Sequence, residues 1–227
     1  MGFFSNEAKE ERLNKMYDPA EIIDDQKYNM VMGGVVIEGL VVNLILCAVC
    51  QNIFETVNPI AFLVFYIICT IAGTLIARKS DNPIVSFVGY NLVVVPIGLL
   101  VSAMVNAYGG LESTVVSNAF LFTLIITGVM IAAAVLYPDF FSKLGGILMA
   151  SLIGLIVAGV VMAIMGIDSV IEAYIGAVIF SLYIGFDFWR SQQYEKTYDN
   201  AVDCALDIYL DIINLFIRIL QIMGRRR

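Results

Sequence analysis

Carboxylates inside otherwise apolar segments are the residues of this sequence most able to do chemistry. The segment 201–222 holds Asp203, Asp207 and Asp211 at intervals of four residues, which places them on one face of a helix. Asp187 lies in the last apolar turns of the preceding segment. A charged residue near the middle of a lone membrane helix costs about 2.5–3.5 kcal/mol, whereas Leu, Ile or Phe returns only about 0.3–0.6 kcal/mol. The acidic face is therefore expected to contact protein or water rather than lipid.

Asp187 and Asp211 are predicted to form a pair. Their midpoint is residue 199, in the polar connection RSQQYEKTYDN. Residues equidistant from the tip of a helix hairpin lie at similar depth, so the two carboxylates are expected to be level, and we further assume that they face each other. Two carboxylates in contact and away from water cannot both ionise readily, and they share a proton. Because the chain has no histidine, such a pair is the group that could switch near neutral pH.

The remaining polar residues of these segments receive weaker assignments. Asp203 is expected to complement the dipole at a helix start, and Asp199 is expected to be a solvated turn residue. Glu38 lies one or two turns inside the first apolar segment, where it either joins a polar interior or extends to the membrane surface. The secondary candidates for an ion pathway are Asp207, Glu38 and Asn214.

The four cysteines are interpreted as small buried apolar residues, although Cys47 and Cys50 form a C-x-x-C pattern. A redox or zinc site would require polar access and further ligands, and the chain offers neither a histidine nor a second cysteine pair. We expect no covalently bound cofactor.

The composition identifies a membrane protein. Hydrophobic residues make up 60% of the 227 residues and charged residues 15%, against about 45–50% and 25% in soluble domains. Disordered, collagen-like and coiled-coil chains have different compositions. The formal net charge of −7 argues against a nucleic-acid partner. The predicted fold class is all-α and polytopic, with the lipid bilayer as its surroundings.

Apolar stretches of about 20 residues, long enough to cross the hydrocarbon core, mark seven predicted spans. They lie at about 30–50, 57–77, 84–106, 116–137, 144–166, 170–189 and 201–222. Proline at the start of the second and third spans fits the first turn of a helix. The connections are short, so we predict a polar N-terminal tail, 1–29, and a single membrane domain, 30–227.

The distribution of basic residues predicts a cytoplasmic N-terminus. The connections after the first, third and fifth spans have no Lys or Arg. The tail and the other three connections carry Lys9, Arg12, Lys15, Lys27, Arg78, Lys79, Lys143, Arg190 and Lys196. The C-terminal run 225–227 disagrees: these arginines lie outside if the last segment crosses, and inside if it is re-entrant. Its 22 residues favour a crossing.

Two motifs resemble those of the Bax inhibitor-1 family, also called the transmembrane BAX inhibitor motif family. YLDIINLF, from Tyr209 to Phe216, resembles its C-terminal signature, and IFSLYIGFDFW, from Ile179 to Trp189, resembles its sixth-helix signature. The interval of 24 residues between Asp187 and Asp211 also fits. The chain resembles in particular the prokaryotic members, which are calcium-leak proteins of the plasma membrane.

The resemblance implies seven helices with the last one central, and a di-aspartyl pH sensor formed by Asp187 and Asp211. It also implies an arginine latch to that sensor, for which Arg78 is the matching position and Lys79 the neighbouring alternative. Two departures concern this assignment. The sequence SDNP follows the latch, and Arg218 lies seven residues past Asp211, where it either competes with Arg78 or marks the outer boundary.

The sequence thus predicts a pH-gated calcium leak channel of a multi-pass protein in a prokaryotic plasma membrane. Ca²⁺ is the transported ion and protons are the regulators, and Asp187 and Asp211 supply the hard oxygen ligands that suit Ca²⁺. The alternatives are an intramembrane aspartyl protease and a non-transporting membrane interaction protein. We expect no enzyme, because the protease contexts Y-D, G-x-G-D and P-A-L are not met. The sequence predicts no oligomeric state.

Overall fold

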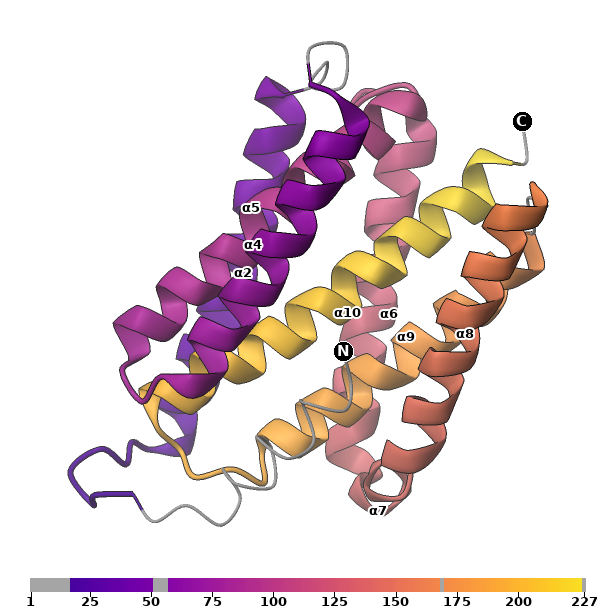
Figure 1. The fold of residues 1–227 in the computed structure, drawn as a ribbon. Helices are drawn as coiled ribbons and strands as arrows, with labels where there is room; N and C mark the ends of the chain where they lie inside the picture. Colours follow the sequence, from indigo (N-terminus) through magenta and orange to yellow (C-terminus); the bar gives the residue numbers. More distant parts are fainter. Residues whose placement is uncertain (1–16, 51–56, 168–169, 226–227) are drawn as a thin grey trace. The chain divides into compact units, whose positions relative to one another are not determined.

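Helices make up the regular structure of the chain. The computed structural model describes residues 17–50, 57–167 and 170–225, and within these ranges it contains helices and no strand. In chain order they are α2 (Asp25–Val49), α4 (Pro59–Lys79), α5 (Pro83–Ala107), α6 (Thr114–Leu136), α7 (Pro138–Ser142), α8 (Gly145–Met165), α9 (Val170–Ser191) and α10 (Tyr198–Gly224) (Figure 1). The all-α prediction is confirmed for this part of the chain.

Seven of these helices coincide with the seven predicted segments. Six of them, α2, α4, α5, α6, α8 and α9, are long and apolar enough to cross a membrane. The last helix, α10, does not join this group, since four aspartates and an arginine lie along its 27 residues. A seventh crossing by α10 therefore stays a prediction. Residues 1–16 of the tail and the last two arginines, 226 and 227, lie outside the described residues.

Polar residues placed just ahead of the helices determine where they start. The side chain of Asp24 accepts a hydrogen bond from the backbone N–H of Lys27, so α2 begins at Asp25, ahead of the predicted start near residue 30. Asn58 and Asn82 cap α4 and α5 in the same way, each followed by a proline in the first turn. After α5, Gly109 and Gly110 have φ values of 99° and 76°, which favour glycine.

The hairpin between α9 and α10 does not turn at residue 199. The backbone N–H of Asn200 donates to Thr197 Oγ1 at 3.1 Å, so Thr197 caps α10, and Asp199 lies in its first turn. The prediction that Asp199 is a solvated turn residue is wrong, because its side chain is buried. The midpoint argument for equal depth of Asp187 and Asp211 loses its premise, and their relative depth stays a prediction.

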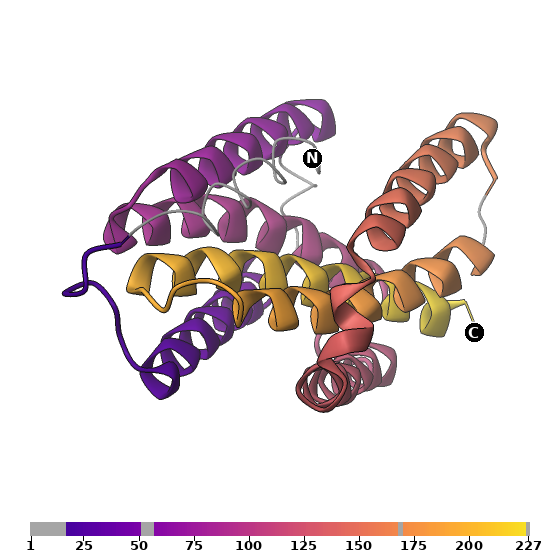
Figure 2. The ribbon, with the colours of Figure 1, turned by 90° about the horizontal axis from the view of Figure 1, so that it is seen from below.

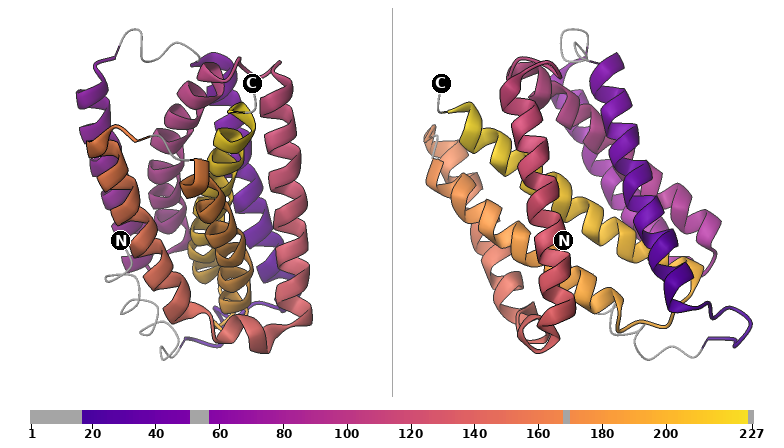
Figure 3. Two further views of the ribbon diagram at one scale, coloured as in Figure 1. Left: turned by 90° about the vertical axis from the view of Figure 1, so that its right-hand side faces the viewer. Right: turned by 180° about the vertical axis from the view of Figure 1, so that it is seen from behind.

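The chain forms two compact units. Unit 1 comprises Met1–Leu111 with Ser191–Tyr209, and unit 2 comprises Glu112–Arg190 with Leu210–Arg227, so α10 contributes to both. In unit 1, α5 contacts both α2 and α4 (Figure 2). In unit 2, the short α7 follows α6 and precedes α8 (Figure 3). The core of unit 2 contains Ala134, Phe141, Leu148 and Phe186. The single membrane domain stays a prediction.

The close crossing of α4 and α5 in unit 1 depends on glycine. A Cβ atom at Gly89 would lie 2.6 Å from the backbone nitrogen of Ala77 and 2.7 Å from the carbonyl oxygen of Gly73. Backbone atoms cannot move aside without separating the helices.

Gly89→Ala is therefore expected to destabilise the protein by about 1–3 kcal/mol, the usual range for overpacking. Thermal unfolding of the purified protein in detergent measures the effect. Gly128→Ala is the matched control, because a Cβ atom at Gly128 meets nothing within 4 Å. Equal melting temperatures for the two variants would contradict the close crossing.

Candidate functional site

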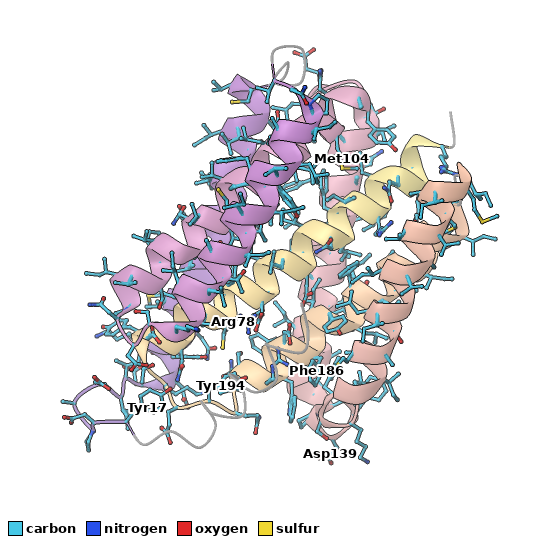
Figure 4. The ribbon with its side chains drawn as sticks, viewed as in Figure 1. Tyr17, Arg78, Met104, Asp139, Phe186 and Tyr194 are labelled. Carbon is cyan, nitrogen blue, oxygen red and sulfur yellow. The ribbon has the colours of Figure 1, made fainter. Side chains whose placement is uncertain are left out.

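Asp187 lies on α9 within unit 2, and its side chain is buried, with 7% exposed. Its carboxylate forms an ion pair with Arg190, one turn later on the same helix. The Arg190 guanidinium carbon also lies 4.9 Å from the centroid of the Phe186 ring, which is labelled in Figure 4. The structure therefore gives Asp187 a counter-ion that the sequence analysis did not assign to it.

Asp211 lies on the part of α10 that belongs to unit 2. Its side chain is 7% exposed, the same fraction as that of Asp187. Both proposed sensor carboxylates are thus buried within one unit, as the apolar surroundings in the sequence predicted. Burial of a carboxylate disfavours its charged form unless a counter-ion or hydrogen bonds compensate.

Arg78 forms an ion pair with Asp207 in unit 1. Its Nη2 atom lies 2.5 Å from Asp207 Oδ1, and the two side chains are 15% and 14% exposed. Arg78 sits in the last turn of α4 (Figure 4), whereas Asp207 lies one turn ahead of Asp211 on α10. The neighbouring Lys79 is exposed. Of the two basic residues at this position, Arg78 is the one paired with a partly buried carboxylate.

The acidic face of α10 is longer than the sequence analysis assumed. Asp199 accepts a hydrogen bond of 2.6 Å from Ser86 Oγ, whose hydroxyl also lies 3.0 Å from the carbonyl oxygen of Ala77. Asp203 is buried too, with 7% of its side chain exposed. Sequence reasoning missed Ser86, because a serine in the first turn of a helix carries no signal for a partner 113 residues away.

Besides Asp207, the secondary candidates are Asn214 and Glu38. Asn214 donates to the carbonyl oxygen of Leu210 on its own helix. The Oε2 atom of Glu38 is buried and makes no hydrogen bond within the described residues. One turn further along α2, Asn43 Nδ2 donates to the hydroxyl of Tyr209 at 2.8 Å. Glu38 thus places an oxygen in the interior of the protein.

Arg218 does not contact the partner of Arg78. Its Nη1 atom lies 2.9 Å from Glu172 Oε1 in unit 2. Of the two alternatives that the sequence left open for Arg218, the structure favours a separate position beyond Asp211. The sequence analysis assigned no role to Glu172, so its role as the counter-ion of Arg218 was missed.

No metal cluster is preformed in the described ranges. No group of three or more His, Cys, Asp or Glu side chains lies there in a position to hold a metal ion. The cysteines form no disulfide in the part of the chain that the structure describes; Cys50 is partly exposed, whereas Cys47, Cys69 and Cys204 are buried. Their burial confirms the interpretation as apolar packing residues.

Long apolar helices together with buried, paired charges define a multi-pass α-helical membrane protein. Residues 25–227 match the family described as inhibitor of apoptosis-promoting Bax1. Since this match covers most of the chain, the protein belongs to the Bax inhibitor-1 family. The resemblance seen in the two C-terminal motifs is therefore confirmed at the level of the family.

Three relatives match parts of the chain. Uncharacterized proteins of two Helicobacter pylori strains, J99 and 26695, are 36% and 35% identical over 124 residues, which are 53% of this chain and 52% of each relative. A protein named Bax inhibitor 1 from Schizosaccharomyces pombe is 38% identical over 87 residues, which are 37% of this chain and 32% of that protein. The chain spans about half the length of the bacterial relatives it matches.

Asp207→Asn is expected to lower the free energy of unfolding by about 3 kcal/mol, because the partly buried guanidinium of Arg78 loses its ion pair with this carboxylate. Arg78→Gln should have a similar effect, and the double variant should be less destabilised than the sum of the two. Unfolding in detergent measures the cycle. Lys79→Gln is the matched control, since it removes the adjacent but exposed charge; additive losses would refute a coupled pair.

Proposed function

We propose that the protein is a pH-gated cation leak channel of a prokaryotic plasma membrane, with Ca²⁺ as its most suitable ion. The observation that carries this proposal is the burial of Asp187 and Asp211 within one unit of a membrane protein. Ionisable residues inside membrane segments are costly and usually mark ion or proton pathways. Membership in the Bax inhibitor-1 family supports the same direction.

Asp187 and Asp211 act as the proton sensor in this proposal. When the pair holds a proton, only one negative charge is buried, and the helices remain closed around it. When the proton is lost, repulsion between the carboxylates or binding of a cation favours an open arrangement. Arg190 balances one of the two charges of the deprotonated pair. The leak should therefore increase as pH rises through the titration range of the pair.

Arg78 acts as the latch of the closed state. Its contact is with Asp207, four residues ahead of Asp211 on α10. A change of charge at Asp211 can act on this contact through one turn of a single helix. The latch in this form ties α4 to α10 through Asp207. Glu38 and Asn214 are secondary candidates for lining the pathway.

The membrane arrangement completes the proposal. Six helices have the length and composition of spans, and α10 is proposed to cross as the central seventh one, with its charged face toward protein. The basic residues predict a cytoplasmic N-terminus, which places Arg78 and the connection from α9 to α10 on the cytoplasmic side. The transported Ca²⁺ is cargo rather than a resident cofactor.

Reconstituted protein in liposomes loaded with a calcium indicator tests this function. The wild type should show a leak that grows from acidic to alkaline pH. Asp211→Asn should remove most of this pH dependence, because the pair loses its shared proton. Glu21→Gln, an exposed carboxylate ahead of α2, is the matched control and should preserve it.

The latch is tested in the same liposomes. Arg78→Ala should raise the leak at acidic pH, where the wild type is closed, and Lys79→Ala should leave it unchanged. A lower leak in Arg78→Ala would contradict the latch. No calcium flux at any pH would contradict the channel itself and favour a non-transporting interaction protein, and cleavage of a membrane peptide would favour a protease.

A further inference from the structure

The pair formed by Glu172 and Arg218 joins two helices of unit 2. Glu172 belongs to the first turn of α9, and Arg218 to the C-terminal part of α10. Arg218 Nη1 lies 2.9 Å from Glu172 Oε1 and donates a hydrogen bond of 3.2 Å to Gln221 Oε1. The two charged side chains are only 20% and 18% exposed. A partly buried pair of this kind costs desolvation and needs supporting contacts.

Two glycines make room for this pair. A Cβ atom at Gly176 would lie 3.0 Å from Arg218 Nε and 3.1 Å from its Cδ atom, so the arginine side chain extends directly across the backbone of α9. A Cβ atom at Gly159 would lie 3.5 Å from Glu172 Oε1, so the carboxylate approaches α8 as well. The pair therefore sits where α8, α9 and α10 come together within unit 2.

The pair lies at the end of α9 opposite to Asp187, and on the C-terminal side of Asp211 on α10. Glu172 is 15 residues ahead of Asp187, which corresponds to about 22 Å along α9. Arg218 is seven residues past Asp211, or about 10 Å along α10. By the predicted orientation, this end faces the outside of the cell. A cation that moves between Asp211 and the outside along α10 has to pass Arg218.

We propose that Glu172 and Arg218 form an outer gate of the cation pathway, separate from the proton sensor. This inference rests on the proposed function. The guanidinium is charged at every physiological pH, and the contact with Glu172 both balances that charge and holds α9 against α10. While the pair is intact, the outer ends of the two helices stay together. When it breaks, they separate and cations reach Asp211 from outside.

Calcium flux in liposomes tests the gate. Glu172→Gln should raise the leak several-fold at every pH while the midpoint of the pH profile stays where the wild type has it. The exchanged double variant, Glu172→Arg with Arg218→Glu, should return the leak toward the wild-type level. Glu112→Gln, an exposed carboxylate of unit 2 on the same predicted side, is the matched control. An unchanged or reduced leak in Glu172→Gln would overturn the gate.

A second variant keeps the test valid where the charge variants fold poorly. Gly176→Ala preserves both charges but places a methyl group 3.0 Å from Arg218 Nε, so the arginine side chain has to shift. This variant should also raise the leak. Gly154→Ala in α8 is its control, because a Cβ atom there meets nothing within 4 Å. No difference in flux between these two variants would count against the gate.

A measurement without calcium separates the gate from the channel. A cysteine introduced at Asn214, between Asp211 and Arg218, should react faster with a membrane-impermeant maleimide when Glu172→Gln is also present. Faster labelling without any calcium flux would support separation of the outer helix ends on loss of the Glu172–Arg218 pair, but would contradict the proposed channel. Unchanged labelling together with a normal pH-dependent leak would reject the outer gate and retain the channel.

Discussion

The compensation of charge along α10 is the constraint on which the rest of this structure depends. A helix with four aspartates and an arginine cannot face lipid, so each charge needs a partner in the protein. Ser86 donates to Asp199, Arg78 pairs with Asp207, and Glu172 pairs with Arg218. These partners come from α5, α4 and α9, so the amphipathic face of one helix determines which surfaces the other helices must present to it.

Close packing is what brings these partners within reach. Gly89 and Gly73 let α4 and α5 of unit 1 approach until backbone atoms touch, near Ala77 and its neighbour Arg78. In unit 2, Gly176 leaves room for the side chain of Arg218. An alanine at Gly73 or Gly89 would clash with backbone atoms of the facing helix, whereas one at Gly176 would crowd the side chain of Arg218. Small residues therefore allow both the close packing of these helices and the ion pairs that lie beside it.

The fold was predictable from local features, whereas the pairing of charges was not. The length of the apolar stretches, the prolines at the starts of α4 and α5 and the glycines after α5 marked the helices to within a few residues. Burial of Asp187 and Asp211 followed from the cost of placing them in lipid. The partners of Asp187, Asp199 and Arg218 did not follow, because Arg190, Ser86 and Glu172 are ordinary surface types whose contacts depend on the folded chain. Asp199 was misjudged because Thr197 caps α10, which places Asp199 in the first turn of that helix and not in the connection before it.

The two interhelical pairs give Asp211 a distinctive position. Asp207 and Arg218 each connect α10 to a different helix, and the eleven residues between them cover about 16 Å. Asp211 lies inside this interval, four residues from one pair and seven from the other. Asp211 thus lies between two ion pairs of opposite orientation. In the first pair α10 contributes the acid, Asp207, and in the second it contributes the base, Arg218. Arg78 and Arg218, the bases of these two pairs, each already balance another carboxylate, Asp207 or Glu172. α10 is therefore tied to a neighbouring helix on each side of Asp211, within about three turns of one helix.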